Sequence, residues 1–246
     1  MDNAGAVVGP LLTAWLLARH TPIREILLWT AITVALALFI REPAREHLKK
    51  PAFSWTMQGF PPVFKRYLLV LALFTLGNSS NMFLLLRAKE MGLPDYQVPI
   101  LWALVSLTAM LFSTPLSALS DRFGRTRLIV SGWGIYGLFY LFLGLNGDVL
   151  WLLWPMFAFY GLFMAATEGA EKALVADLAP KELLGTAYGW FNLTAGIMLL
   201  PASILFGWLW QSFRPETAFG FSAGCAILAA IMLKFWVAPK QHTPHP

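Results

Sequence analysis

Eight mostly apolar stretches of about 14 to 24 residues follow one another along this chain, and they limit its fold more than any other feature. Crossing about 30 Å of hydrocarbon takes roughly 20 apolar residues as an α-helix, and only the first stretch is clearly shorter. The stretches lack the alternation of strands, and an open sheet cannot satisfy its backbone polar groups in lipid. The sequence therefore predicts an all-α, polytopic transmembrane bundle with eight spans at residues 5–18, 23–40, 67–86, 98–119, 128–145, 150–170, 187–210 and 216–237.

The composition excludes most water-soluble classes of protein. Of the 246 residues, 58% are hydrophobic and 13% are charged, against roughly 25% charged in soluble domains. The four histidines lie outside the apolar stretches, and the one cysteine cannot form an intrachain disulfide. The sequence has no zinc pattern, phosphate-binding glycine loop or serine nucleophile motif. We therefore expect no metal, no cofactor and no enzymatic activity, with a gradient of protons or another ion as the source of energy.

Lysine and arginine are distributed unevenly between alternate connections, and this asymmetry predicts the orientation in the membrane. The positive-inside rule places both termini of this chain in the cytoplasm, for a multi-pass protein of the plasma (inner) membrane. The basic connection 41–66 is interpreted as a linker near anionic lipid, in preference to a nucleic-acid-binding segment. Thirteen basic residues fall on the cytoplasmic side: Arg41, Arg45, Lys49, Lys50, Lys65, Arg66, Arg122, Arg125, Arg127, Lys172, Lys181, Lys234 and Lys240. Five fall on the other side: Arg19, Arg24, Arg87, Lys89 and Arg214.

The connection between the fourth and fifth spans carries the most specific motif. Asp121, Arg122, Gly124 and Arg125 match in register the pattern G-x-x-x-D-[RK]-x-G-R-[RK], and this loop resembles the loop signature of the major facilitator superfamily. A serine replaces the leading glycine, and a threonine replaces the last basic residue. So short a loop favours a glycine that tolerates positive φ, with arginines at the lipid headgroups. The resemblance implies a loop that stabilises the closed inner gate, and an ordinary positive-inside hairpin is the alternative.

A second motif lies in the first span, where Gly5, Gly9 and Pro10 resemble the G-x-x-x-G-P-x-x-G-G pattern in the fifth helix of proton-driven antiporters of the same superfamily. Two other small residues replace the final glycines. A similar spacing recurs 191 residues later at Gly196 and Pro201, as expected for the equivalent fifth and eleventh helices of two related halves. Small residues four apart also let helices pack closely, so a plain packing face is the alternative.

This register divides the chain into four parts. Residues 1–40 are expected to be the last two helices of an amino-terminal six-helix bundle, 41–66 the central linker, 67–238 a complete carboxyl-terminal six-helix bundle, and 239–246 a cytoplasmic tail. The chain thus resembles helices five to twelve of a twelve-helix transporter, a partial fold of this superfamily truncated at its amino terminus. An eight-helix protein that dimerises is the alternative, whereas a full-length chain would not require an oligomer. An upstream coding stretch with four apolar runs would distinguish the two.

Charged and polar residues within the spans are candidates for the gate and the substrate cavity. Glu168 and Lys172 share a helix face and resemble the E-x-x-x-R element of sugar porters, with a weaker lysine pair. They are assigned either to the inner gate or to simple interface charges. Three further sets are cavity candidates, although each amide could instead bond to a neighbouring helix and the tryptophans could belong to an aromatic belt. These candidates are Asn78, Ser79 and Asn81, then Asn192, then Trp102.

Together these features predict the class of function. The resemblance implies a secondary active permease in a lipid bilayer. Such a permease moves a small molecule, here of unknown identity, across the bilayer by alternating access. The antiporter-like string favours proton-coupled efflux. The first alternative is a truncated product that does not transport, and we expect no transport by the 246-residue chain alone. The second alternative is a membrane-embedded enzyme. No nucleic-acid partner is expected.

Overall fold

The computed structural model describes residues 2–19, 21–22, 24–25, 56–145 and 149–237, and within these ranges all regular structure is helical. Short 3-10 turns, Leu150–Leu152 and Lys181–Leu183, precede α7 and α8, and a π-helical segment, Leu233–Val237, continues α9. The α-helices are α1 (Asp2–Ala18), α3 (Pro62–Gly77), α4 (Met82–Glu90), α5 (Gln97–Phe123), α6 (Arg125–Leu145), α7 (Leu153–Leu178), α8 (Leu184–Ser212) and α9 (Pro215–Met232).

Six helical segments of the described chain are long and apolar enough to cross a membrane, which confirms the all-helical membrane class. The first predicted span is a helix, α1, but its apolar part, Ala6–Ala18, is shorter than the six helical segments that could cross a membrane. The second, 23–40, lies outside the described residues apart from its first positions. The structure therefore supports six of the eight predicted spans. They are Pro62–Glu90, Gln97–Ser120, Arg125–Leu145, Leu150–Leu178, Lys181–Ser212 and Pro215–Val237.

The helices begin and end where the sequence offers a stop or a start. Pro62 and Pro215 occupy the first helical positions of α3 and α9, where a missing N–H costs nothing. Gly124 separates α5 from α6 with a φ of 90°, so the tight connection uses the conformation that glycine tolerates. The fourth and fifth spans are thus joined by one residue, which is shorter than the predicted loop, and the positive φ expected at Gly124 is confirmed.

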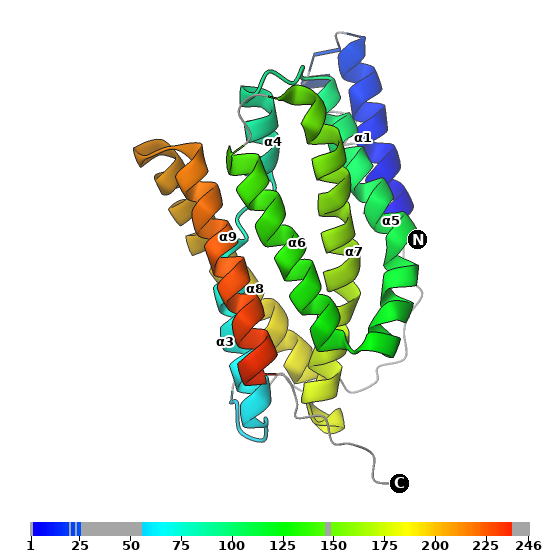
Figure 1. Ribbon diagram of the computed structural model, residues 1–246. Coiled ribbons are helices and arrows are strands. Elements are labelled where there is room, and N and C mark those ends of the chain that lie inside the picture. The colour runs from blue at the N-terminus through cyan, green and yellow to red at the C-terminus, as the bar shows by residue number, and fades with distance from the viewer. Residues whose placement is uncertain (1, 20, 23, 26–55, 146–148, 238–246) are drawn as a thin grey trace.

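The helices pack in a bundle in which α7 lies between α5 and α6, α6 also packs along α9, and α3 contacts α8 and α9 (Figure 1). The helix α1 runs beside α5. Glycines lie where several of these helices approach one another closely. A Cβ at Gly161 would lie 2.7 Å from the Val105 carbonyl oxygen, and one at Gly144 would lie 2.9 Å from Phe219 Cβ. Small residues thus bring membrane helices together where lipid offers no hydrophobic driving force.

Aromatic rings fill the space between α3, α6 and α7. Trp133 is fully buried and stacks on Phe74 with ring centroids 4.3 Å apart, and Tyr136 stacks on Tyr140 at 4.1 Å. Such pairs contribute roughly 0.5–1.5 kcal/mol beyond the burial of their area. The interior of this part of the bundle is therefore a rigid aromatic layer.

The third predicted span, 67–86, is broken in its middle. Residues 78–80 are not helical, so α3 ends at Gly77 and α4 begins at Met82. Asn78 and Asn81 therefore do not lie on one regular helix face, because the helical spacing does not exist there. The break arises where a glycine, two asparagines and two serines follow one another, since these residues favour turns over helix interiors.

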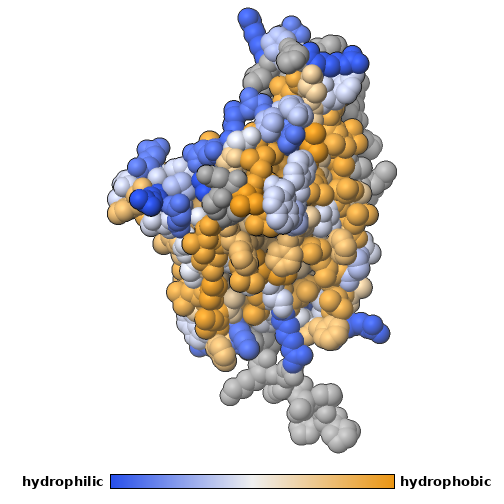
Figure 2. Space-filling view, turned by 45° about the horizontal axis from the view of Figure 1, so that its top comes forward, coloured by the Kyte–Doolittle hydropathy of each residue, from blue (hydrophilic) through white to orange (hydrophobic). Residues whose placement is uncertain are grey.

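On the face shown in Figure 2, apolar side chains form a broad band across the bundle, and hydrophilic side chains gather toward its two ends. The segment around α8 is the least enclosed, with 11% of its most apolar window buried. Large side chains such as Leu200 and Ile204 are exposed on it. The band has the character expected of a surface that faces lipid or another membrane helix.

Candidate functional site

The predicted gate motif lies at the end of the bundle where α5 ends and α6 begins. Arg122 occupies the last turn of α5 and is exposed, Gly124 forms the connection, and Arg125 is the first residue of α6. The side chain of Asp121 lies outside the described part of the chain. The same end carries the start of α3, the end of α7 and the end of α9, and we call it the basic end.

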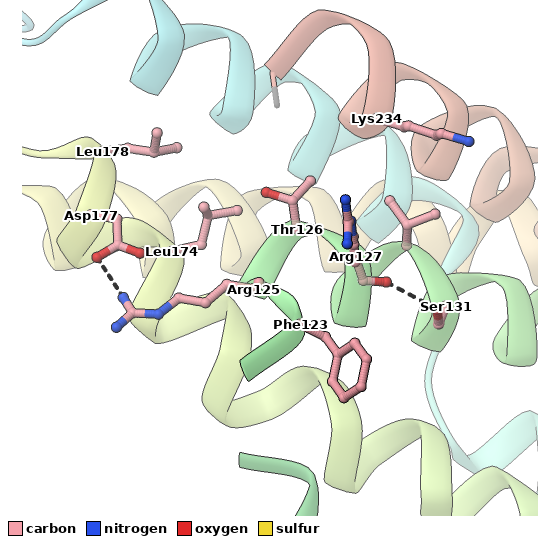
Figure 3. Close-up of a pocket in the computed structure, with 11 residues that line it drawn as sticks. Phe123, Arg125, Thr126, Arg127, Ser131, Leu174, Asp177, Leu178 and Lys234 are labelled. Carbon is pink, nitrogen blue, oxygen red and sulfur yellow. Dashed lines mark hydrogen bonds and ion pairs between the residues drawn. The ribbon is translucent and has the colours of Figure 1, made fainter. Parts of the chain in front are cut away.

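Arg125 connects this loop to the end of α7. Its Nη1 atom lies 2.6 Å from Asp177 Oδ1 and donates a hydrogen bond of 2.5 Å to the Ala173 carbonyl oxygen (Figure 3). The two charged side chains are 29% and 52% exposed, so water screens the pair. An ion pair of this kind contributes about 0.2–1 kcal/mol. The structure thus joins Arg125 to the end of α7 through a carboxylate that the sequence analysis did not single out.

The position of Asp177 in the sequence indicates that this carboxylate needs a basic partner. It lies two residues before Ala179, where α7 stops ahead of a proline, and on the side of the membrane predicted to hold the basic loop. An acidic residue at the carboxyl end of a helix is unfavourable with the helix dipole, so a basic partner is expected nearby.

Glu168 and Lys172 form the predicted pair along α7. The Lys172 Nζ atom lies 3.2 Å from Glu168 Oε1, and the two side chains are 56% and 70% exposed. They also line a small cavity of about 240 Å³ between α5 and α7. Glu168 and Lys172 therefore pair with each other, whereas Arg125 of the loop pairs with Asp177.

A carboxylate that lies between these two residues in the sequence, Glu171, has a buried partner. Glu171 Oε1 accepts a hydrogen bond of 2.9 Å from Trp133 Nε1, which belongs to α6 and is fully buried. Glu171 lies within the membrane-crossing segment Leu150–Leu178. The sequence analysis did not select it, although a third charge within five residues of an apolar helix was the available signal.

Tyrosines hold the break between α3 and α4. Tyr136 donates to the Gly77 carbonyl oxygen at 2.9 Å, and Tyr160 donates to Asn81 Oδ1 at 2.9 Å. The first bond satisfies a backbone acceptor left by the interrupted helix, as membrane proteins require. The Asn81 side chain thus bonds to a neighbouring helix, which was the alternative to a place in the substrate cavity.

The remaining candidate residues are dispersed. Ser79 is buried and Asn78 half-buried at the break, Trp102 packs against the core on α5, and Asn192 is exposed on α8. Among the packing residues, Gly5, Gly9 and Pro10 belong to α1, and Gly196 and Pro201 to α8. A Cβ at Gly9 or Gly196 would meet nothing within 4 Å, so no described helix packs on these two glycines. The described residues contain no group of three potential metal ligands.

Comparisons with known proteins agree with this architecture. The chain is 32% identical over 249 residues to an uncharacterized MFS-type transporter of Methanocaldococcus jannaschii, which covers 95% of this chain and 61% of that protein. A second such transporter of that organism is 29% identical over 147 residues, 59% of this chain and 37% of that protein. The class B tetracycline resistance protein of Escherichia coli is 26% identical over 144 residues, 58% of this chain and 35% of that protein.

The chain therefore spans less than two thirds of the length of each of these relatives. No solved structure matches it. Residues 67–246, which hold most of α3 and all of α4 to α9, match the Major Facilitator Superfamily as a sequence family. Because this match covers most of the chain, the chain belongs to the major facilitator superfamily.

Proposed function

We propose that this chain is part of a secondary active transporter that moves a small molecule by alternating access, with proton coupling and in the direction of efflux. The observation that carries the proposal is the carboxylate of Glu171, which lies within a membrane-crossing segment and is bonded to the buried indole of Trp133. Ionisable groups inside spans are costly, and they mark ion or substrate pathways. A carboxylate can bind and release a proton, and its bond to Trp133 ties that change to the packing of α6 against α7.

The contact of Arg125 with α7 supports the gating part of the proposal. The pair joins the start of α6 to the end of α7, and its partial exposure keeps its contribution to about 1 kcal/mol or less. A gate has to open and close many times, so a contact that breaks at low cost suits this role. Under this proposal Asp121, Arg122 and Gly124 shape the loop, while Glu168 and Lys172 act as neighbouring charges.

The direction and the substrate class rest on weaker support. The string Gly5, Gly9 and Pro10 resembles part of an antiporter motif, and one relative is a tetracycline resistance protein. Both favour export of a small, hydrophobic or cationic compound from the plasma (inner) membrane. Two alternatives remain: a truncated, non-transporting product and, with less support, a membrane-embedded enzyme.

Proton exchange in everted vesicles tests the proposal. Vesicles from cells that express the 246-residue chain are compared with vesicles from cells that express it together with any coding sequence found in frame upstream. Tetracycline or ethidium is added after a proton gradient is formed, and a pH-sensitive dye reports proton release. We expect probe-dependent proton release from the longer product alone. Probe-dependent proton release by the short chain would exclude the non-transporting alternative. If neither product releases protons with any probe, the transporter proposal is rejected.

Two matched variants test the role of Glu171. Glu171→Gln removes the titratable group but keeps an acceptor for Trp133, so it should abolish proton exchange while the protein still inserts in the membrane. Glu168→Gln changes an exposed carboxylate three residues away and should retain most of the exchange. Equal activity of both variants would remove Glu171 from the proposed mechanism.

A further inference from the structure

A hollow of about 730 Å³ lies at the basic end, between the start of α6, the end of α7 and the π-helical segment after α9. Its walls include Arg125, Arg127, Asp177 and Lys234, and we call it the basic hollow. We propose that the basic hollow binds the phosphate group of an anionic phospholipid. This inference does not depend on transport, because it requires only that the bundle lies in a bilayer.

The charges of the basic hollow leave two cations for a ligand. Figure 3 shows Arg125 and Asp177 on one side of the view, where they pair, and Arg127 and Lys234 on the other side. Both Arg127 and Lys234 are exposed, and neither forms an ion pair within the described residues. Since Arg125 neutralises Asp177, the hollow has a net positive charge that complements a phosphate.

The backbone contributes with both signs. The 21-residue helix α6 begins at Arg125, and its first turn, with Thr126 and Arg127, lines the hollow. The amino-terminal N–H groups of a helix lack partners within the helix, and its dipole favours an anion there. The end of α7 and the segment after α9 also line the hollow, and the dipole at a carboxyl end has the opposite sign. The attraction for a phosphate therefore comes mainly from the side-chain cations of Arg127 and Lys234.

The apolar wall distinguishes a lipid from a soluble anion. Val130 and Leu174 line the hollow beside the charges. Farther along the same two helices, Leu138 on α6 and Ile227 and Ile231 on α9 are exposed apolar side chains. A headgroup at Arg127 and Lys234 would therefore have its acyl chains along an apolar surface. Basic pockets between membrane helices commonly take anionic lipid headgroups.

The chain's own carboxyl-terminal end is a poor competitor. Residues 238–246 contain a lysine and two histidines but no aspartate or glutamate, so their side chains do not complement the basic hollow. An anionic lipid supplies both the charge and the apolar tail that the two walls require.

Native mass spectrometry of the full chain in detergent tests the proposal. Dioleoyl phosphatidylglycerol is added to one sample and dioleoyl phosphatidylcholine to another, and the fractions of protein with bound lipid are compared. Phosphatidylglycerol should bind more tightly, and the double variant Arg127→Gln/Lys234→Gln should weaken it about 25-fold, or roughly fivefold for each cation lost. The pair Lys65→Gln/Lys181→Gln removes the same charge at the same end but outside the hollow, and it should bind phosphatidylglycerol like the original chain.

Two further samples separate a lipid site from a general anion site. Short-chain dihexanoyl phosphatidylglycerol should bind more weakly than the dioleoyl form, and inorganic phosphate should compete poorly. The conservative variant Arg127→Lys should keep most of the binding, which guards against a loss caused by misfolding. Equal binding of the two headgroups, equal loss in both double variants, or full competition by inorganic phosphate would each overturn the proposal.

Discussion

Arg125 makes two contacts with α7, and its contribution to stability can be separated from that of its neighbours. We expect a double-mutant cycle of Arg125→Gln and Asp177→Asn, followed by unfolding in mixed micelles, to give a coupling free energy of about 0.2–1 kcal/mol. The reason is the 2.6 Å pair between two partly exposed groups. The cycle Glu168→Gln with Lys172→Gln, which tests a more exposed pair on one helix face, should give about 0.3–0.5 kcal/mol. A coupling of zero for Arg125 would contradict its role as a connection between α6 and α7.

Trp133 offers a sharper test at the same scale, because its ring and its N–H have separate partners. Trp133→Phe keeps an aromatic ring against Phe74 but leaves the carboxylate of Glu171 without its donor, so it should lower the free energy of unfolding by about 1–3 kcal/mol. The double variant Trp133→Phe/Glu171→Met removes both polar partners and should recover most of that loss. If the double variant is as unstable as the single one, packing of the indole explains the effect and the hydrogen bond does not.

Among the helices, the break between α3 and α4 depends on contacts from other elements. Tyr136→Phe leaves the buried Gly77 carbonyl oxygen without its donor, so amide hydrogen exchange should rise at residues 78–82 and remain unchanged in α8. Tyr160→Phe affects a less buried bond to Asn81 and should have a smaller effect. Tyr188→Phe removes an exposed bond to the Lys172 carbonyl oxygen and serves as the control. Exchange that rises equally in all three variants would show that the break does not depend on Tyr136.

The close approach of α5 and α7 gives a second prediction for the helices. A Cβ at Gly161 would lie 2.7 Å from the Val105 carbonyl oxygen, so Gly161→Ala should separate the helices and lower the free energy of unfolding by about 1–3 kcal/mol. Gly134→Ala, at a position where a Cβ meets nothing within 4 Å, should be neutral or slightly stabilising because alanine favours the helix. Unfolding midpoints in mixed micelles measure both, and a neutral Gly161→Ala would mean that the two helices can move apart freely.

These elements also show what could be predicted from the sequence. The six described spans follow from apolar length, and the α5–α6 turn follows from Gly124, because both are local properties. The break after Gly77 could not be derived, since average hydropathy conceals it and tyrosines from α6 and α7 help to hold it. The pairs Arg125–Asp177 and Trp133–Glu171 join residues 52 and 38 positions apart, so they depend on which helix faces meet.

For the molecule as a whole, orientation in the membrane is a prediction that the bundle makes testable. The ends of α5, α7 and α9 meet at the basic end, and the asymmetry of thirteen against five basic residues predicts that this end lies in the cytoplasm. The natural Cys225 is buried, so it should react little with a membrane-impermeant maleimide, and background labelling should be low. We expect Lys181→Cys to be labelled only after intact cells are made permeable, and Asp95→Cys, at the opposite end, to be labelled before. The reverse pattern would invert the topology and move the basic hollow to the outer leaflet.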